Sequence, residues 1–124
     1  MMIAVGTFEV MLSAQNDEIA PVGRMLIDKT YTGALVGKGV GQMISKRTEN
    51  GIAVYFAIEE FVGSIDDNKG SFTLLHKGEM SAAAQSLKIT ILTGSGSHEL
   101  RDISGKMRII QQDGKHSYEL EYHL

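Results

Sequence analysis

The sequence predicts an all-β protein, an antiparallel barrel of about eight strands. Segments rich in Val, Ile, Thr, Tyr and Phe alternate in polarity at period two, which is typical of strands. Fourteen glycines and a single proline indicate many turns and few helices ended by proline. Asp113-Gly114, between two alternating runs, is a strong signal for a two-residue hairpin turn.

Length and composition indicate one globular domain, residues 1–124. A chain of 124 residues can bury a single core, and 43% hydrophobic with 22% charged residues is the balance of a folded protein. The net charge is −3 and the cations are scattered, whereas a nucleic-acid surface needs clustered cations, so we expect no nucleic-acid partner. The absence of cysteine excludes disulfides, thiolate catalysis and cysteine-bound zinc.

The N-terminal segment MMIAVGTFEVML has no basic region and is interrupted by Glu9, so we expect no secretory signal. No stretch reaches the roughly 20 apolar residues of a membrane-spanning helix. We therefore expect a cytoplasmic protein without a membrane partner.

The first two strands are expected at residues 3–13 and 24–32, on either side of a loop that contains Pro21. Residues 24–32 alternate, so that Lys29 shares the more apolar face with Met25, Ile27 and Tyr31. The long stem of Lys29 can either reach out of that face or meet a partner within it.

Residues 34–46 carry Gly37, Gly39 and Gly41 at period two, so all three face the same way. Such a glycine ladder suits a curved strand or one that is pressed against another backbone. A phosphate-binding loop is disfavoured because no helix signal follows the glycines.

Residues 51–81 are expected to form a long hairpin around an Asp-Asp-Asn-Lys turn. A loop centred between Asp67 and Asn68 pairs Glu59 with His76, Phe61 with Leu74, Ala57 with Gly78 and Tyr55 with Met80. The second strand alternates clearly, with Phe72, Leu74, His76 and Met80 on its apolar side. The inner face is therefore the one that holds His76, and Glu59 shares it.

The other face of the first hairpin strand is too apolar for water. It carries Ile52, Val54, Phe56, Ile58, Glu60 and Val62. A strand that is apolar on both faces is usually covered on both. With no helix to cover it, we expect this stripe to contact another subunit in a homo-oligomer; an exposed apolar patch is the alternative.

The remaining strands follow at residues 84–93 and on both sides of Asp113-Gly114. A tight turn at Ala82-Ala83 keeps the inner face of 84–93 in phase with the preceding strand. Residues 94–105, GSGSHELRDISG, are expected to close the barrel, with at most one short helical turn near residues 97–103, rather than to bind an anion. The last hairpin pairs Ile109 with Tyr118, Met107 with Leu120 and Gly105 with Tyr122, and sets Arg108 and Lys106 opposite Glu119 and Glu121.

Closure of these strands into a barrel removes exposed edges, and eight strands leave room for a filled core or one small ligand. An open sandwich is the alternative.

Five stretches resemble, in order, one bacterial family of unknown function, the domain-of-unknown-function family three-two-two-four: GTFEV at 6–10, KTYTG at 29–33, GSFTLLHKGEM at 70–80, GSGSHELRDISG at 94–105 and YELEY at 118–122. The resemblance covers nearly the whole chain. That family is similar in fold to the allene oxide cyclase barrel, an eight-stranded barrel that forms oligomers. The resemblance implies a fold and an interior cavity, and it implies no reaction.

Glu59 with His76 is the sharpest candidate site. A carboxylate that orients an imidazole inside an apolar barrel suits a general base, a ligand-binding pair, or a structural pair whose members satisfy each other. All three interpretations stay open. The candidate ligand-binding residues on the predicted inner faces are Lys29, Tyr31, Tyr55, Glu59, Phe72, Leu74, His76, Tyr118 and Tyr122.

The sequence predicts no cofactor and no metal, because the four histidines have no short ligand spacing. We expect a β-barrel that binds a small apolar or amphipathic molecule in its interior. The alternatives are an enzyme of the cyclase or isomerase kind that uses His76 with Glu59, and a structural or interaction module with a filled core. Enzymatic activity is left undecided by the sequence.

Overall fold

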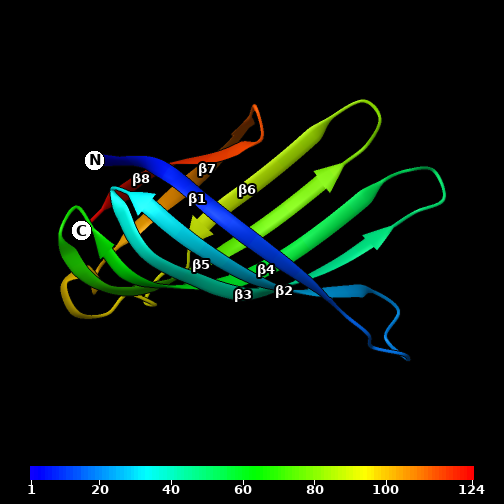
Figure 1. Cartoon of the computed structure of the whole chain (residues 1–124), viewed down its shortest axis with the longest axis horizontal. Coiled ribbons are helices and arrows are strands. Elements are labelled where there is room, and N and C mark those ends of the chain that lie inside the picture. The colour runs from blue at the N-terminus through cyan, green and yellow to red at the C-terminus, as the bar shows by residue number, and fades with distance from the viewer.

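The computed structural model describes all 124 residues as a closed antiparallel barrel of eight strands in sequence order (Figure 1). The elements are β1 (Met2–Gln15), β2 (Gly23–Gly33), β3 (Leu35–Arg47), β4 (Ala53–Ile65), β5 (Asn68–Met80), β6 (Gln85–Ile91), the 3-10 turn η1 (His98–Leu100), β7 (Ser104–Gln112) and β8 (Lys115–His123). Because β1 also pairs with β8, the sheet has no free first and last strand. The predicted all-β barrel is confirmed, and the open sandwich is excluded.

The two ends of the barrel differ in packing. Both termini and the short β2–β3 and β4–β5 connections lie at one end, the closed end, where inward side chains are fully buried: Leu35, Ile65, Leu100, Ile103 and Tyr122. At the other end, the open end, the connections at 48–52 and 81–84 project beyond the barrel (Figure 1). There the inward-facing Leu12, Met80 and Leu87 remain 53%, 37% and 41% exposed.

The β4–β5 hairpin turns one residue earlier than the sequence predicts. Ile65 pairs with Asn68, and Asp66 and Asp67 form the turn with φ angles of 47° and 71°. Two successive left-handed residues fit the right-handed twist of a hairpin, and aspartate tolerates them better than most residues. The predicted pairing of Glu59 with His76 is therefore wrong by two residues along the strand.

In the observed register Ala57 pairs with His76, Glu59 with Leu74, Phe61 with Phe72, Tyr55 with Gly78 and Ala53 with Met80. Side chains alternate at period two, so a shift of two residues leaves every side chain on its predicted face. Glu59 and His76 still point inward, and they meet diagonally rather than directly across the ladder.

The other two predicted hairpins are confirmed. Met80 pairs with Gln85 around Ala82-Ala83, and Gln112 pairs with Lys115 around Asp113-Gly114. On the outer face of the last hairpin, the predicted Arg108–Glu119 and Lys106–Glu121 pairs lie at 3.1 and 3.5 Å between charged atoms.

The segment GSGSHEL replaces β6 along the first half of β5. Beyond Ile91, the backbone N–H groups of Thr73, Ser71 and Lys69 donate instead to the side chains of Ser95, Ser97 and Glu99, at 3.0, 2.9 and 3.0 Å. Acceptors at every second residue thus satisfy an otherwise open strand edge. The segment GSGSHEL is therefore the connection that closes the barrel, as the sequence predicts.

No helix of the fold is long and apolar enough to cross a bilayer.

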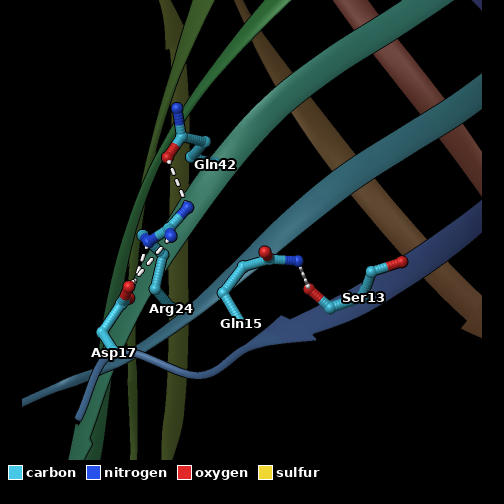
Figure 2. A network of polar contacts seen from close by, with 5 residues as sticks. All are labelled: Ser13, Gln15, Asp17, Arg24 and Gln42. Carbon is cyan, nitrogen blue, oxygen red and sulfur yellow. Dashed lines mark hydrogen bonds and ion pairs between the residues drawn. The ribbon is translucent and has the colours of Figure 1, made fainter.

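The β1–β2 loop is tied to the barrel by Arg24 (Figure 2). Its guanidinium donates two hydrogen bonds to the Asp17 carboxylate, at 2.7 and 3.0 Å, and one to Gln42 Oε1 at 3.2 Å. Nearby, Gln15 Nε2 donates to the backbone oxygen of Ser13. The hydrogen bond from Arg24 lowers the pKa of Asp17. This forked contact connects the loop to β2 and β3 at the open end.

Candidate functional site

The inner face of the barrel holds a cluster of polar side chains around one carboxylate. Glu59 on β4 is 0% exposed, and its Oε1 accepts hydrogen bonds from Lys29 Nζ at 3.0 Å and from His76 Nε2 at 2.9 Å. Its Oε2 accepts from the Tyr31 hydroxyl at 2.5 Å. Because a carboxylate accepts, the proton in the His76–Glu59 contact belongs to Nε2. Side chains from β2 and β5 therefore converge on Glu59 of β4.

Gly39 on β3 makes the space for this cluster. It pairs with Lys29 on one side and with Phe61 on the other, and it is buried on the inner face. A β-carbon at this position would run into Glu59 Oε2 and the Tyr31 ring. The missing side chain lets Glu59 on β4 reach across β3 to residues of β2. The glycine ladder is structural, as expected, but one of its members also shapes the site.

Lys29 is held by an aromatic contact as well as by its ion pair. Its Nζ lies 4.7 Å from the centroid of the Phe8 ring, within the range of a cation–π contact. Phe8 in turn stacks on His116, with ring centroids 5.2 Å apart. Of the two side-chain orientations expected for Lys29, the structure shows the inward one, since the residue is only 5% exposed.

The cluster keeps Glu59 ionised. Burial raises the pKa of Glu59, but the hydrogen bond from His76, the positive charge of Lys29 and the hydrogen bond from Tyr31 outweigh burial and lower the pKa to about 2. Burial raises the pKa of Tyr31, and the negative charge of Glu59 raises it further. Glu59 is therefore an anion and Tyr31 a neutral donor at neutral pH.

The lowered pKa of Glu59 predicts acid sensitivity. A carboxyl group with an ordinary pKa of 4.5 and a folded pKa of about 2 stabilises the fold fully above pH 4.5, and this contribution is lost as the pH falls toward 2. Since one pKa unit corresponds to about 1.4 kcal/mol, we expect the free energy of unfolding to fall by about 2 kcal/mol on this account between about pH 5.5 and 3.

Urea unfolding at several pH values, on the wild type and on Lys29→Met/Glu59→Gln, checks this expectation. The double variant lacks the ionisable pair but keeps Asp17 and the other carboxylates, so the difference between the two curves isolates Glu59. Parallel curves would mean that Glu59 does not titrate with a lowered pKa.

Two side chains of the cluster keep polar groups without a hydrogen-bond partner. Lys29 donates only to Glu59, although an ammonium group has three donors. His76 Nδ1, which is an acceptor when Nε2 carries the ring proton, has no hydrogen-bond partner in the protein. Their side chains are 7% and 6% exposed, whereas Glu59 is fully buried. The inner face toward the closed end is filled by the hydrophobic core.

The predicted site residues fall into two groups. Lys29, Tyr31, Glu59 and His76 come together, and Tyr55 lies over Gly78, half-buried, on the side of the open end. The others belong to the filled half of the barrel: Phe72, Leu74, Tyr118 and Tyr122.

The two tyrosines of β8 already have partners at the closed half of the barrel. The Tyr118 hydroxyl donates to the Thr32 oxygen and accepts from the Leu35 N–H, both at 2.8 Å, and the Tyr122 hydroxyl donates to Asp66 at 2.5 Å. Neither is part of the cluster around Glu59.

The sequence reasoning missed Phe8 and Gly39 as parts of the site. Phe8 lies on the inner face of β1, which gave no clear alternation in the sequence. For Gly39 a signal existed, since a glycine ladder adjacent to a strand with an inward lysine marks space for a long buried side chain. The predicted outer stripe, Ile52, Val54, Phe56, Ile58 and Val62, lies on the outer face of the barrel, and Val54 alone among these residues is half-buried.

The fold and the cluster define a class of protein: a closed eight-stranded barrel, filled at one end, with a buried ion pair on its inner face. Residues 4–122 match the family described as "Protein of unknown function (DUF3224)". The chain is also similar to the crystal structure of a protein of unknown function from the DUF3224 family of Shewanella oneidensis MR-1. The two are 35% identical, the match covers 100% of this chain and 97% of that chain, and the TM-score is 0.92. No curated protein is similar in sequence.

The chain belongs to the DUF3224 family, as its sequence motifs predict. The further likeness to the allene oxide cyclase barrel stays a prediction, and so does the role of His76 as a general base with Glu59.

Proposed function

We propose that the protein binds a small amphipathic molecule with an anionic head group in the open end of the barrel. The observation that carries this proposal is the set of unused ammonium donors of Lys29, beside the unpartnered His76 Nδ1, at the base of an apolar mouth. An eight-stranded barrel has room for one such ligand. The Glu59 carboxylate positions Lys29 and His76 and does not itself contact the ligand.

The donors favour an anionic head over a neutral one. Lys29 is positively charged, and Glu59 neutralises it from the side of the filled core. A carboxylate or similar anion that approaches from the open end meets the remaining ammonium N–H groups of Lys29. Charge-assisted hydrogen bonds in such a water-poor place are worth about 1.5–3 kcal/mol each.

The inner wall of the open end suits an apolar tail. Its inward side chains are half-buried or exposed, and most are apolar: Val10, Leu12, Met25, Met43, Tyr55, Met80, Leu87 and Ile109. Small-molecule sites are usually lined in this way, with a few polar groups that fix orientation. Methionines adapt to ligands of varying shape, so we expect selectivity for the head rather than for the tail.

Calorimetric titration with decanoate and with decanol tests this function. The two probes share a tail and differ in the charge of the head. We expect wild-type protein to bind decanoate at least roughly ten-fold more tightly, which corresponds to about 1.4 kcal/mol, and Lys29→Met/Glu59→Gln to lose that preference while it still binds decanol.

Lys77→Met provides the matched control, because Lys77 is on the outer face. It should leave both affinities unchanged. Equal affinity for the two probes in the wild type, or a preference that depends on Lys77 and not on Lys29, would refute the proposed site.

A further inference from the structure

A groove of about 950 Å³ runs along the outer face of the barrel. Six outward-facing apolar side chains from β2 to β5 line it and are called here the outer apolar groove: Leu26, Val40, Ile44, Phe56, Ile58 and Leu75. The lining also includes Gly41, Ala57 and His76, which alternate with these residues along the same strands. Phe56 and Ile58 are 47% and 59% exposed. Soluble monomers rarely expose a continuous apolar surface of this kind, and such a surface commonly marks an interaction site.

The charged residues that line the groove have no ionic partners within the chain. Glu60, Lys77 and Lys88 all line it, and none of them takes part in an ion pair or a side-chain hydrogen bond. Lys77 and Lys88 are directly opposed on β5 and β6. Like charges in that position are destabilising, so the surface carries a cost that an acidic partner would remove.

The arrangement of these charges is self-complementary. Ile58 on β4 pairs directly with Leu75 on β5. Glu60 lies on one side of this pair, opposite Thr73, and Lys77 lies on the other side, opposite Phe56. Consider a two-fold axis that is perpendicular to the strands, parallel to the sheet, and passes over the Ile58–Leu75 pair. Rotation about this axis packs the apolar centre of one copy against the apolar centre of the other. The same rotation brings Glu60 of each copy toward Lys77 of the other.

We infer that the occupant of the outer apolar groove is a second copy of this chain, in a two-fold symmetric dimer. A small anionic amphiphile would pair with the lysines but would be repelled by Glu60, whereas a second copy pairs charges of both signs. The inference refines the subunit contact expected from the β4 stripe. It keeps Phe56 and Ile58, adds Leu26, Val40, Ile44 and Leu75, and leaves out Ile52, Val54 and Val62. It is independent of ligand binding inside the barrel.

Sedimentation velocity across the micromolar range, on protein refolded from denaturant to remove bound lipids, provides the test. We expect the wild type to be a dimer. Glu60→Lys and Lys77→Glu should each raise the dissociation constant roughly ten-fold, because the contact occurs twice in the dimer, and Glu60→Lys/Lys77→Glu should restore the wild-type value. Ile58→Asp should give a monomer.

Val5→Asp is the matched control, since Val5 is an exposed residue (56%) on the outer face of β1, away from the groove. It should remain a dimer, and circular dichroism should show every variant folded. A wild type that stays monomeric throughout the range overturns the inference. A double charge reversal that does not restore association also overturns it. A third contradicting result would be a native mass spectrum of untreated protein that shows a monomer with a bound apolar molecule, if Ile58→Asp abolishes the binding of that molecule.

Discussion

Glu59→Gln is expected to lower the free energy of unfolding by about 3–5 kcal/mol at neutral pH. The substitution removes the anion to which Lys29, Tyr31 and His76 donate, and leaves the Lys29 ammonium buried without a counterion. A typical domain is stable by about 5–15 kcal/mol, so this loss is a large share of the total, and the variant is measured at low temperature to keep it folded. Urea unfolding monitored by circular dichroism measures it.

Removal of both the Lys29 and the Glu59 charge should lower the free energy of unfolding by less than removal of the Glu59 charge alone. In Lys29→Met/Glu59→Gln no buried charge remains, and the methionine fills the space of the lysine stem, so we expect much of the lost stability to return. Glu9→Gln is the control, because Glu9 is exposed on the outer face of β1, away from the outer apolar groove, and we expect a change within about 0.5 kcal/mol. A double variant that is less stable than Glu59→Gln would show that the ion pair is not a coupled unit.

Gly39→Ala is expected to lower the free energy of unfolding by about 1–3 kcal/mol. The backbone at Gly39 has no positive φ angle, so the cost comes from the added methyl group alone, which meets Glu59 and the Tyr31 ring. One of them must move, and the hydrogen bond between them must lengthen or break. We therefore also expect Gly39→Ala to weaken decanoate binding.

Gly23→Ala provides the comparison for Gly39→Ala. Gly23 also has no positive φ angle, and the nearest atom to an added β-carbon is the Ser45 hydroxyl oxygen at 3.3 Å, which can rotate away. This variant should unfold at nearly the urea concentration of the wild type. Equal effects of the two substitutions would mean that Gly39 has no special role in making space for Glu59.

The faces of the strands could be predicted from the sequence, but one register could not. Asp113-Gly114 admits one obvious turn, and the pairing of Ile109 with Tyr118 follows. In Asp66-Asp67-Asn68-Lys69, more than one two-residue turn is compatible with the residues, and the chain uses the first two. Because the two registers differ by an even number, Glu59 and His76 keep their faces even though their pairing was wrong.

The cluster around Glu59 could be predicted only in part. Glu59 and His76 share one hairpin, so local alternation brings them to one face. The contact from Tyr31 to Glu59 joins residues 28 positions apart, on strands that are not hydrogen-bonded neighbours, and it crosses β3 at Gly39. No periodicity within one strand encodes such a contact. The same holds for the outer apolar groove, of which only the β4 residues were visible as a stripe.

Binding inside the open end is the central claim, and the methionine methyl groups test it most directly. Met25, Met43 and Met80 face inward at the open end, whereas Met107 is in the filled core and Met11 is 72% exposed on the outer face. The outer apolar groove contains no methionine. In ¹³C-methyl spectra during a decanoate titration, we expect the signals of Met25, Met43 and Met80 to shift and those of Met11 and Met107 to stay in place. Saturable decanoate binding that leaves Met25, Met43 and Met80 unshifted, or no binding at all, would contradict the proposed function.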